Sequence, residues 1–269
     1  IIMSIYSYSL QGKRDSNEDK HVHFMNLNGK DKKMNKVNFI GVFDGHGGKL
    51  VSKYLKNNLP KYFINKFKNE IYQHNKKAVK YFEGAFDLLQ KNIEKQHPRA
   101  SKYCGSTALC GIQYLDRANR SNLWMLNTGD SRAIMCNGHE LAVQLTKDHK
   151  PNSPDERQRI EQLGGKVRFD GVDWRVKDLS LSRAFGDCES RPFITHMPQI
   201  YKYKIRKKDN FVIFACDGLW DAVSNQDAVD FVLNLKKKNY KGNYAKKLSE
   251  YAIKQGSYDN VTSVIMFLI

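Results

Sequence analysis

The sequence predicts an α+β domain built from layers of helices and strands. Two short apolar runs, 38–43 and 211–216, are typical of buried strands. Between Lys76 and Gln96, apolar residues recur at helical spacing and indicate an amphipathic helix. Strand-like runs occur toward both ends of the chain with helices between them, which favours a mixed layered domain over regular βαβ alternation. No repeat or linker divides the 269 residues, so we expect one domain over 1–269.

The first half of the chain gives four further indications. The run 38–43 ends at Asp44-Gly45, and the helix over 76–96 has Val79, Phe82, Phe86, Leu89 and Ile93 on one stripe. Segments 123–127, 132–136 and 140–144 predict a meander of three strands. Its second turn contains Asn137-Gly138, a pair typical of type I′ hairpins.

The second half begins with a charged, turn-rich stretch, 147–198, which we expect to be a surface excursion that forms a flap beside a functional site. After the run 211–216, Ser224 is a predicted helix N-cap with Asp227 three positions on. A further helix is predicted over 244–255 with Gly256 as its stop, and 261–268 predicts a last strand.

The net charge of +17 raises the question of nucleic-acid binding. The basic clusters Arg206-Lys207-Lys208 and Lys236-Lys237-Lys238 are short and have no interleaved aromatic residues. We therefore expect no nucleic-acid partner and interpret most of the charge as decoration of solvent-facing surface. A positive surface would still concentrate acidic, phosphorylated substrates near the protein.

Cysteine usage and hydropathy bear on the cellular setting. The five cysteines are odd in number and form no CxxC pair, so we expect buried, reduced thiols and a cytoplasmic or nuclear protein. No apolar run is long enough to cross a bilayer, and no leader-like segment is visible. Because the first residue is Ile1, we expect a fragment or a processed chain, and we expect it to be monomeric.

Four aspartates occur at predicted strand ends. Asp44 and Asp217 each follow a buried strand and precede glycine, Asp130 follows a strand, and Asp259 precedes the last one. Strand ends can converge on one place, where carboxylates would repel each other unless cations neutralised them. Oxygen ligands alone favour hard cations such as Mg²⁺ or Mn²⁺. Either Asp-Gly pair by itself could be a simple turn.

His46, directly after Asp44-Gly45, is a candidate general acid, with a hydrogen-bonded structural histidine as the alternative. The glycines Gly47 and Gly48 allow the backbone to approach a ligand closely. Other phosphate chemistries lack their spacing. No cysteine is followed by arginine six positions later, and no GxxxxGK[ST] loop or Cys/His zinc pattern occurs.

These segments, taken in order, resemble the catalytic domain of the PP2C-type, metal-dependent protein phosphatases. The resemblance covers nearly the whole chain and depends on motifs that are only moderately specific one by one but very specific as an ordered set. They are RDSNED (14–19), VFDGHGG (42–48), GSTA (105–108), NTGDSRA (127–133), DHKPNSP (148–154), LSLSRAFGD (179–187), ACDGLWD (215–221) and Asp259-Asn260.

The resemblance implies a four-layer α-β-β-α sandwich, with two central antiparallel sheets flanked by helices and a flap subdomain. It also implies two Mg²⁺ or Mn²⁺ ions that activate water. Asp44 would bridge them, Gly45 and Glu18 would help to hold one, and Asp217 and Asp259 would hold the other. Arg14 would bind the substrate phosphate, and His46 would protonate the leaving group. Asp19 would hold metal-bound water in place by hydrogen bonding. Asp130 and Asp221 would bind a weaker third cation.

The implied activity is hydrolysis of phosphoserine and phosphothreonine esters on proteins. Two alternatives stay open: a catalytically silent scaffold that binds regulatory partners, and hydrolysis of a non-protein phosphate ester. The carboxylates Glu18, Asp44, Asp217 and Asp259 are all present, which favours activity. One departure from the family is Gln199 after Pro198, where an acidic residue is common, and this bears on substrate docking.

Overall fold

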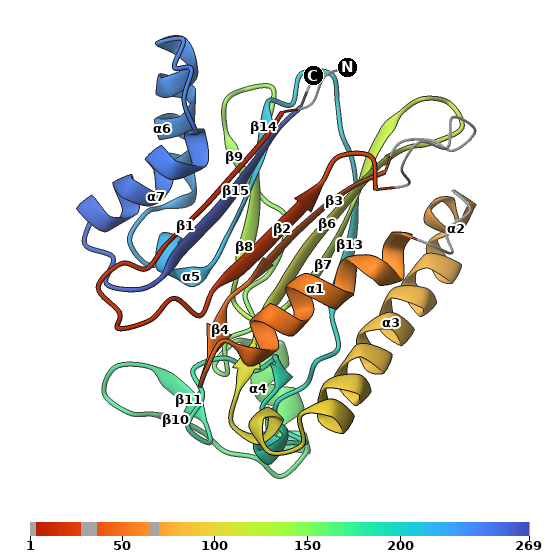
Figure 1. The fold of residues 1–269 in the computed structure, drawn as a ribbon, viewed down its shortest axis with the longest axis vertical. Helices are drawn as coiled ribbons and strands as arrows, with labels where there is room; N and C mark the ends of the chain where they lie inside the picture. Colours follow the sequence, from red (N-terminus) through yellow and green to blue (C-terminus); the bar gives the residue numbers. More distant parts are fainter. Residues whose placement is uncertain (1–3, 28–36, 65–69, 269) are drawn as a thin grey trace.

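A computed structural model describes residues 4–27, 37–64 and 70–268 of the chain. Two five-stranded sheets are stacked at its centre, and helices cover both outer faces (Figure 1). All strand pairs within these two sheets are antiparallel. The predicted four-layer α+β sandwich is therefore confirmed.

The first sheet has the strand order β1-β15-β14-β8-β9. Its strands are β1 (Ile5–Leu10), β15 (Val261–Phe267), β14 (Phe211–Ala215), β8 (Arg132–Cys136) and β9 (Ala142–Gln144). Helices α6 (Asn225–Lys237) and α7 (Tyr244–Lys254) cover its outer face (Figure 1). The Ser224 hydroxyl accepts a hydrogen bond from the Asp227 backbone N–H, which confirms the predicted cap of α6.

The second sheet has the order β13-β7-β6-β3-β2. Its strands are β13 (Gln199–Lys204), β7 (Ser121–Thr128), β6 (Ala108–Leu115), β3 (Val37–Phe43) and β2 (Lys20–Phe24). Helices α1 (Leu50–Ile64) and α3 (Asn75–Gln96), with the short α2 (Glu70–Gln73), lie on its outer face (Figure 1). The predicted helix over 76–96 corresponds to α3, whose buried stripe includes Phe82, Phe86, Leu89 and Ile93.

Three apolar clusters hold these layers together. One lies between the second sheet and α1 and α3, one between the first sheet and α6 and α7, and one between the two sheets. Each cluster contains fully buried aromatic side chains. Examples, in the same order, are Phe39, Phe211 and Phe214. Burial of an aromatic or large aliphatic side chain stabilises a fold by about 1.5–3 kcal/mol, so these clusters fix the stacking of the sheets.

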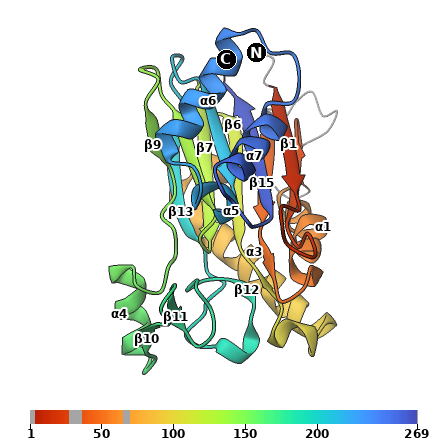
Figure 2. The same cartoon turned by 90° about the vertical axis from the view of Figure 1, so that its left-hand side faces the viewer.

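Several short elements lie at one end of the sandwich. The residues that directly follow β3 and β14 lie at the same end. A small sheet joins β12 (Phe185–Gly186), β5 (Gly105–Ser106) and β4 (Gly45–His46), and α5 (Asp217–Trp220) follows β14. Within 147–198, α4 (Pro154–Gln162) and the hairpin of β10 (Val167–Phe169) and β11 (Trp174–Val176) project below the sheets (Figure 2). This segment has its own small apolar cluster, which includes Ile160, Val176 and Ile194.

Two predictions of local topology are wrong. The expected meander over 123–144 does not form, because β7 belongs to the second sheet and only β8 and β9 pair as a hairpin. Gly129, with a φ of 102°, allows the chain to cross from one sheet to the other. The hairpin turn is also not type I′ at Asn137-Gly138. It is a longer turn in which Glu140 takes the left-handed conformation.

Within the described residues, no helix combines the length and the apolar character that crossing a membrane would require.

Candidate active site

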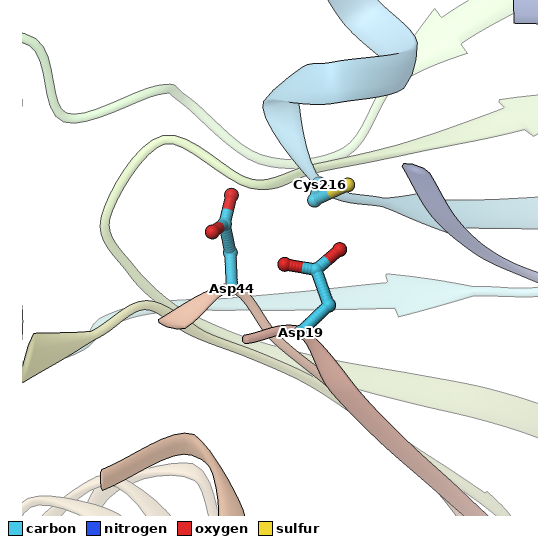
Figure 3. Close-up of side chains that lie close together, drawn as sticks. All are labelled: Asp19, Asp44 and Cys216. Carbon is cyan, nitrogen blue, oxygen red and sulfur yellow. The ribbon is translucent and has the colours of Figure 1, made fainter. Parts of the chain in front are cut away.

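Two aspartates from neighbouring strands form the centre of the candidate site. Asp19 precedes β2 and Asp44 follows β3, and these strands pair antiparallel, so the two residues lie at the same sheet edge. In Figure 3 both side chains rise on the same side of their strands, toward the segment with Cys216, which directly follows β14. One possible ligand atom from each of the three side chains lies within 4.8 Å of those of the other two.

The environment of Asp19 fits a cation. Its side chain is buried, and neither carboxylate oxygen has a hydrogen-bond partner among the described residues. Burial raises its pKa above the ordinary value and outweighs the lowering effect of the nearby Thr262, Cys216 and Asp44 side chains. A buried carboxylate without partners is costly, and a cation beside it, directly or through a water that the cation binds, would remove the cost.

Burial also raises the pKa of the neighbouring carboxylates Asp44 and Asp217. Burial raises the pKa of Asp44 well above its ordinary value, and the nearby charges of Asp19, Asp217 and Asp130 raise it further. Burial, followed by the charge of Asp130, raises the pKa of Asp217 to about 8. These pKa values are raised because several acidic groups lie close together in a partly buried site. Divalent cations bound there would neutralise their charge.

Cys216 does not change the character of this donor set. Its Sγ donates a hydrogen bond to the Asn260 carbonyl oxygen at 3.4 Å, and burial raises the pKa of the thiol well above its ordinary value. The thiol proton is thus engaged by a backbone carbonyl, whereas metal-binding cysteines are thiolates. The donors that remain are oxygens, which suits Mg²⁺ or Mn²⁺ better than zinc.

Glu18 and Gly45 form one wall of the site. Glu18 Oε2 accepts a hydrogen bond from the Gly48 backbone N–H at 2.9 Å, and its carbonyl oxygen accepts one from Ser52 Oγ at 2.5 Å. A Cβ at position 45 would lie 2.6 Å from the Glu18 carbonyl oxygen and 2.7 Å from Ser52 Oγ. Only glycine leaves room for this close approach, which keeps the Gly45 backbone next to Glu18.

On the opposite side, a lysine lies between two of the predicted ligands. Lys150 Nζ forms a salt bridge with Asp130 and lies 4.0 Å from Asp217 Oδ2. Burial acts to lower the pKa of Lys150, but the charges of Asp130 and Asp217 outweigh it and raise the pKa above its ordinary value. Asp221 ends α5 nearby and is exposed. Lys150 lies within the motif at 148–154, but nothing in the local sequence predicts this role for it.

Arg14 and Asp259 lie together at the rim of the site. Arg14 Nη2 is 2.7 Å from Asp259 Oδ2, and their side chains are 62% and 37% exposed. Asp259 Oδ1 also accepts a hydrogen bond from the Asn260 backbone N–H at 2.7 Å. The partial exposure leaves the Arg14 guanidinium accessible to a phosphate from solvent.

His46 has a partner, Asp187, that is distant in the sequence and was not predicted. Its Nε2 is 2.7 Å from Oδ2 of Asp187, a residue whose side chain is only 3% exposed. Burial acts to lower the pKa of His46, but the hydrogen bond and charge of Asp187 outweigh it and raise the pKa. Gly105 faces both groups, and a Cβ there would overlap Asp187 Oδ2 and His46 Nε2. The only signal in the sequence was the position of Asp187 at the end of the motif at 179–187.

The arrangement thus combines three chemical parts at one end of the sandwich. A cluster of carboxylates can hold hard cations, an exposed guanidinium can bind an anion, and a histidine with a raised pKa can donate a proton. Asp19, Asp217 and Asp130 are all close enough to Asp44 to raise its pKa. These parts suit the hydrolysis of a phosphate ester.

Comparison with known proteins gives a consistent result. The family model described as protein phosphatase 2C matches residues 4–261. Among relatives, the chain is 38% identical to probable protein phosphatase 2C 45 of Oryza sativa subsp. japonica, covering 86% of this chain and 76% of that protein. It is 36% identical to probable protein phosphatase 2C 59 of Arabidopsis thaliana, covering 97% and 78%.

Solved structures share the fold. A sex-determining protein of C. elegans superposes with a TM-score of 0.85 at 27% identity, covering 99% of this chain and 65% of that one. The serine-threonine phosphatase 2C of Toxoplasma gondii superposes with a TM-score of 0.81 at 21% identity, covering 98% and 94%.

Proposed function

The chain belongs to the protein phosphatase 2C family, and from this premise we propose that it hydrolyses phosphoserine and phosphothreonine esters of proteins with two Mg²⁺ or Mn²⁺ ions. Family membership makes it a protein phosphatase domain. The metal count, the residue roles and the substrate class are the proposal. The observation that carries it is the buried Asp19 carboxylate, which has no hydrogen-bond partner among the described residues and lies beside Asp44.

The carboxylates divide into two sets around Asp44. Asp44 would contact both ions, Glu18 and the Gly45 carbonyl would complete one site, and Asp217 and Asp259 would complete the other. Asp19 would accept hydrogen bonds from water in the same place, which would satisfy its buried oxygens. Divalent cations held in this way lower the pKa of water, so that hydroxide is available near neutral pH.

The other residues act directly on the substrate. Arg14 binds the phosphate oxygens, for which the planar guanidinium has matching donors. His46 protonates the oxygen of the leaving serine or threonine. Because Nε2 is engaged by Asp187, the other ring nitrogen, Nδ1, delivers this proton. Asp187 acts through His46 and is a positioning residue.

A weaker third cation at Asp130 and Asp221 remains part of the proposal. Lys150 already neutralises Asp130, so a cation there would compete with the ammonium group, which agrees with weak binding. We also keep the proposals of a monomer and of a cytosolic or nuclear setting. All five cysteines are free, which fits a reducing compartment.

The test is hydrolysis of a phosphothreonine peptide with Mn²⁺, with excess chelator, and by an Asp217→Asn variant. We expect turnover only for the intact, metal-loaded protein. Activity that survived chelation or the substitution would refute the two-metal mechanism. A metal-loaded protein that bound phosphopeptides without turning them over would support the scaffold alternative, and turnover of small esters alone would support a non-protein substrate.

A further inference from the structure

We propose that a groove between α1 and α3, which begins at the loop 47–49 directly after His46 (the catalytic loop), binds an acidic segment of the phosphoprotein substrate. This inference rests on the proposed function and adds to it a determinant of substrate choice. The two helices run next to each other on the outer face of the second sheet (Figure 1). The groove therefore lies beside the site and outside the carboxylate cluster.

The groove consists of two connected hollows. The first, of about 760 Å³, begins at Gly47 and Gly48, next to His46, and runs along the first turns of α1. The second, of about 710 Å³, continues between α1 and α3. Tyr54 and Asn58 line both hollows, so the two form one continuous surface. A bound chain can thus extend from the catalytic loop along the helices.

The walls of the groove follow the helical repeat. Tyr54, Asn58 and Tyr62 are spaced by four on α1, and α3 contributes a row with the same spacing that includes Gly84 and Leu88. A Cβ at Gly84 would have no atom within 4 Å, so the groove is open there. The α1 residues from 50 to 62 span about 18 Å at 1.5 Å per residue. An extended peptide covers that length with about six residues.

The charge of the groove has one sign. Five cationic side chains line it, and no aspartate or glutamate does. In the part of the chain that the structure describes, none of the five forms a salt bridge. By contrast, Lys91 on α3 pairs with Asp87 one turn away at 2.6 Å. The five are Lys49, Lys53, Lys61, Lys80 and Arg99.

Apolar and aromatic surface lies between these cations. Tyr103 is 70% exposed and Leu88 is 49% exposed, and both line the groove. The Tyr62 ring is held in place, because its hydroxyl accepts a hydrogen bond from Asn92 Nδ2 at 3.0 Å. The surface thus suits a peptide in which acidic residues alternate with apolar ones. Its continuity with the catalytic loop of a protein phosphatase favours a peptide over a nucleic acid.

The experiment compares two phosphothreonine peptides of equal length. One has acidic residues mixed with leucine over about six positions beside the phosphothreonine, and the other has glutamine in place of each acid. Each exposed ion pair contributes only weakly, so a few of them together should lower KM for the acidic peptide about fivefold to tenfold. The preference should shrink at high salt. Peptides with the acidic segment on either side of the phosphothreonine cover both chain directions.

Gly84→Glu and Gly84→Gln form a matched pair of variants. Both fill the open part of the groove to the same extent, and both replace a helical glycine with a better helix former, so they should fold. Gly84→Glu should abolish the preference for the acidic peptide, while Gly84→Gln should keep at least half of it. A third variant, Lys53→Glu, changes the charge on α1, which forms the other wall of the groove. It should also reduce the preference for the acidic peptide.

Hydrolysis of 4-nitrophenyl phosphate reports on the catalytic centre alone and should be unchanged in all three variants. If the intact, metal-loaded protein hydrolysed neither the peptides nor the small ester, the proposed function itself would be contradicted. Normal turnover with equal KM for the two peptides would overturn the groove inference. So would equal effects of Gly84→Glu and Gly84→Gln, or an oligonucleotide of matched charge that competes more strongly than the acidic peptide.

Discussion

The substitution Asp187→Asn tests most directly whether His46, held by Asp187, donates a proton to the leaving group. The substitution keeps the shape of the side chain and removes its charge. Asp187 has a φ of 46°, in the left-handed region, which asparagine adopts readily, so the backbone should not change. His46 would keep a hydrogen-bond acceptor in place and lose the anion that stabilises its protonated form.

The magnitude follows from the geometry of the pair. His46 Nε2 and Asp187 Oδ2 are 2.7 Å apart, and the two side chains are 26% and 3% exposed, so solvent screens their interaction little. A hydrogen bond to a charged group contributes about 1.5–3 kcal/mol. A neutral hydrogen bond of the kind that asparagine keeps contributes about 0.5–1.5 kcal/mol, so the charge accounts for about 1–1.5 kcal/mol. At about 1.36 kcal/mol per factor of ten, the expected loss in kcat is about 5- to 13-fold for a substrate that needs the proton.

The assay compares two leaving groups. The alkoxide of a phosphothreonine peptide needs a proton as it leaves, whereas nitrophenolate is a stable anion and needs little help. We therefore expect the full loss in kcat with the phosphothreonine peptide and a much smaller one with 4-nitrophenyl phosphate. In a His46→Ala background, Asp187→Asn should cause almost no further loss, because the two residues act as one unit.

Equal losses with both substrates would refute the assignment of His46 and Asp187 to proton transfer. An undiminished effect of Asp187→Asn in the His46→Ala background would show that Asp187 acts on something other than His46. Circular dichroism and thermal unfolding of the variant serve as controls for folding.

Two further predictions concern stability. The folded-state pKa of Asp217 is raised from 3.8 to about 8, so the stability linked to its protonation is present below pH 3.8 and is lost as the pH rises toward 8. Asp217→Asn should therefore stabilise the metal-free protein at pH 7 by about 1–3 kcal/mol, and an unchanged Tm in chelator would contradict this. Glu156 is buried, and Arg183 and Arg159 at 2.5 and 2.9 Å overcome the effect of burial and lower its pKa from 4.5 to about 2. The stability it contributes is present above pH 4.5 and is lost as the pH falls to about 2, so Glu156→Gln should cost about 3 kcal/mol in urea unfolding at pH 7 and little near pH 2. Equal losses at both pH values would count against this ion-pair network.

The elements that the sequence predicted well are those with strong local patterns. The run at 38–43, the amphipathic stripe of α3 and the cap at Ser224 each depend on residues close in sequence, and each appears within a residue or two of its expected place. Helix α1 was not predicted. Its sequence contains Pro60 and two neighbouring asparagines, which locally disfavour a helix, and it is stabilised by packing on the second sheet.

Long-range arrangement was decided only by the tertiary structure. Nothing near residues 123–144 indicates that β7 and β8 belong to different sheets, since both strands are apolar and almost entirely buried. His46 and Asp187 are 141 positions apart and meet because β4 and β12 both pair with β5. The role of Lys150 between Asp130 and Asp217 is equally invisible in the local sequence.

By itself, the sequence determined which groups end the strands: aspartates, followed twice by glycine, with a histidine two residues after Asp44. That is enough to predict oxygen ligands for a hard cation, because residue type sets ligand chemistry. The tertiary structure decided which carboxylates share one buried place and which partner raises the pKa of His46. The physical reason is that repulsion, burial and hydrogen bonding depend on distances of a few ångströms, which only the stacking of the two sheets establishes.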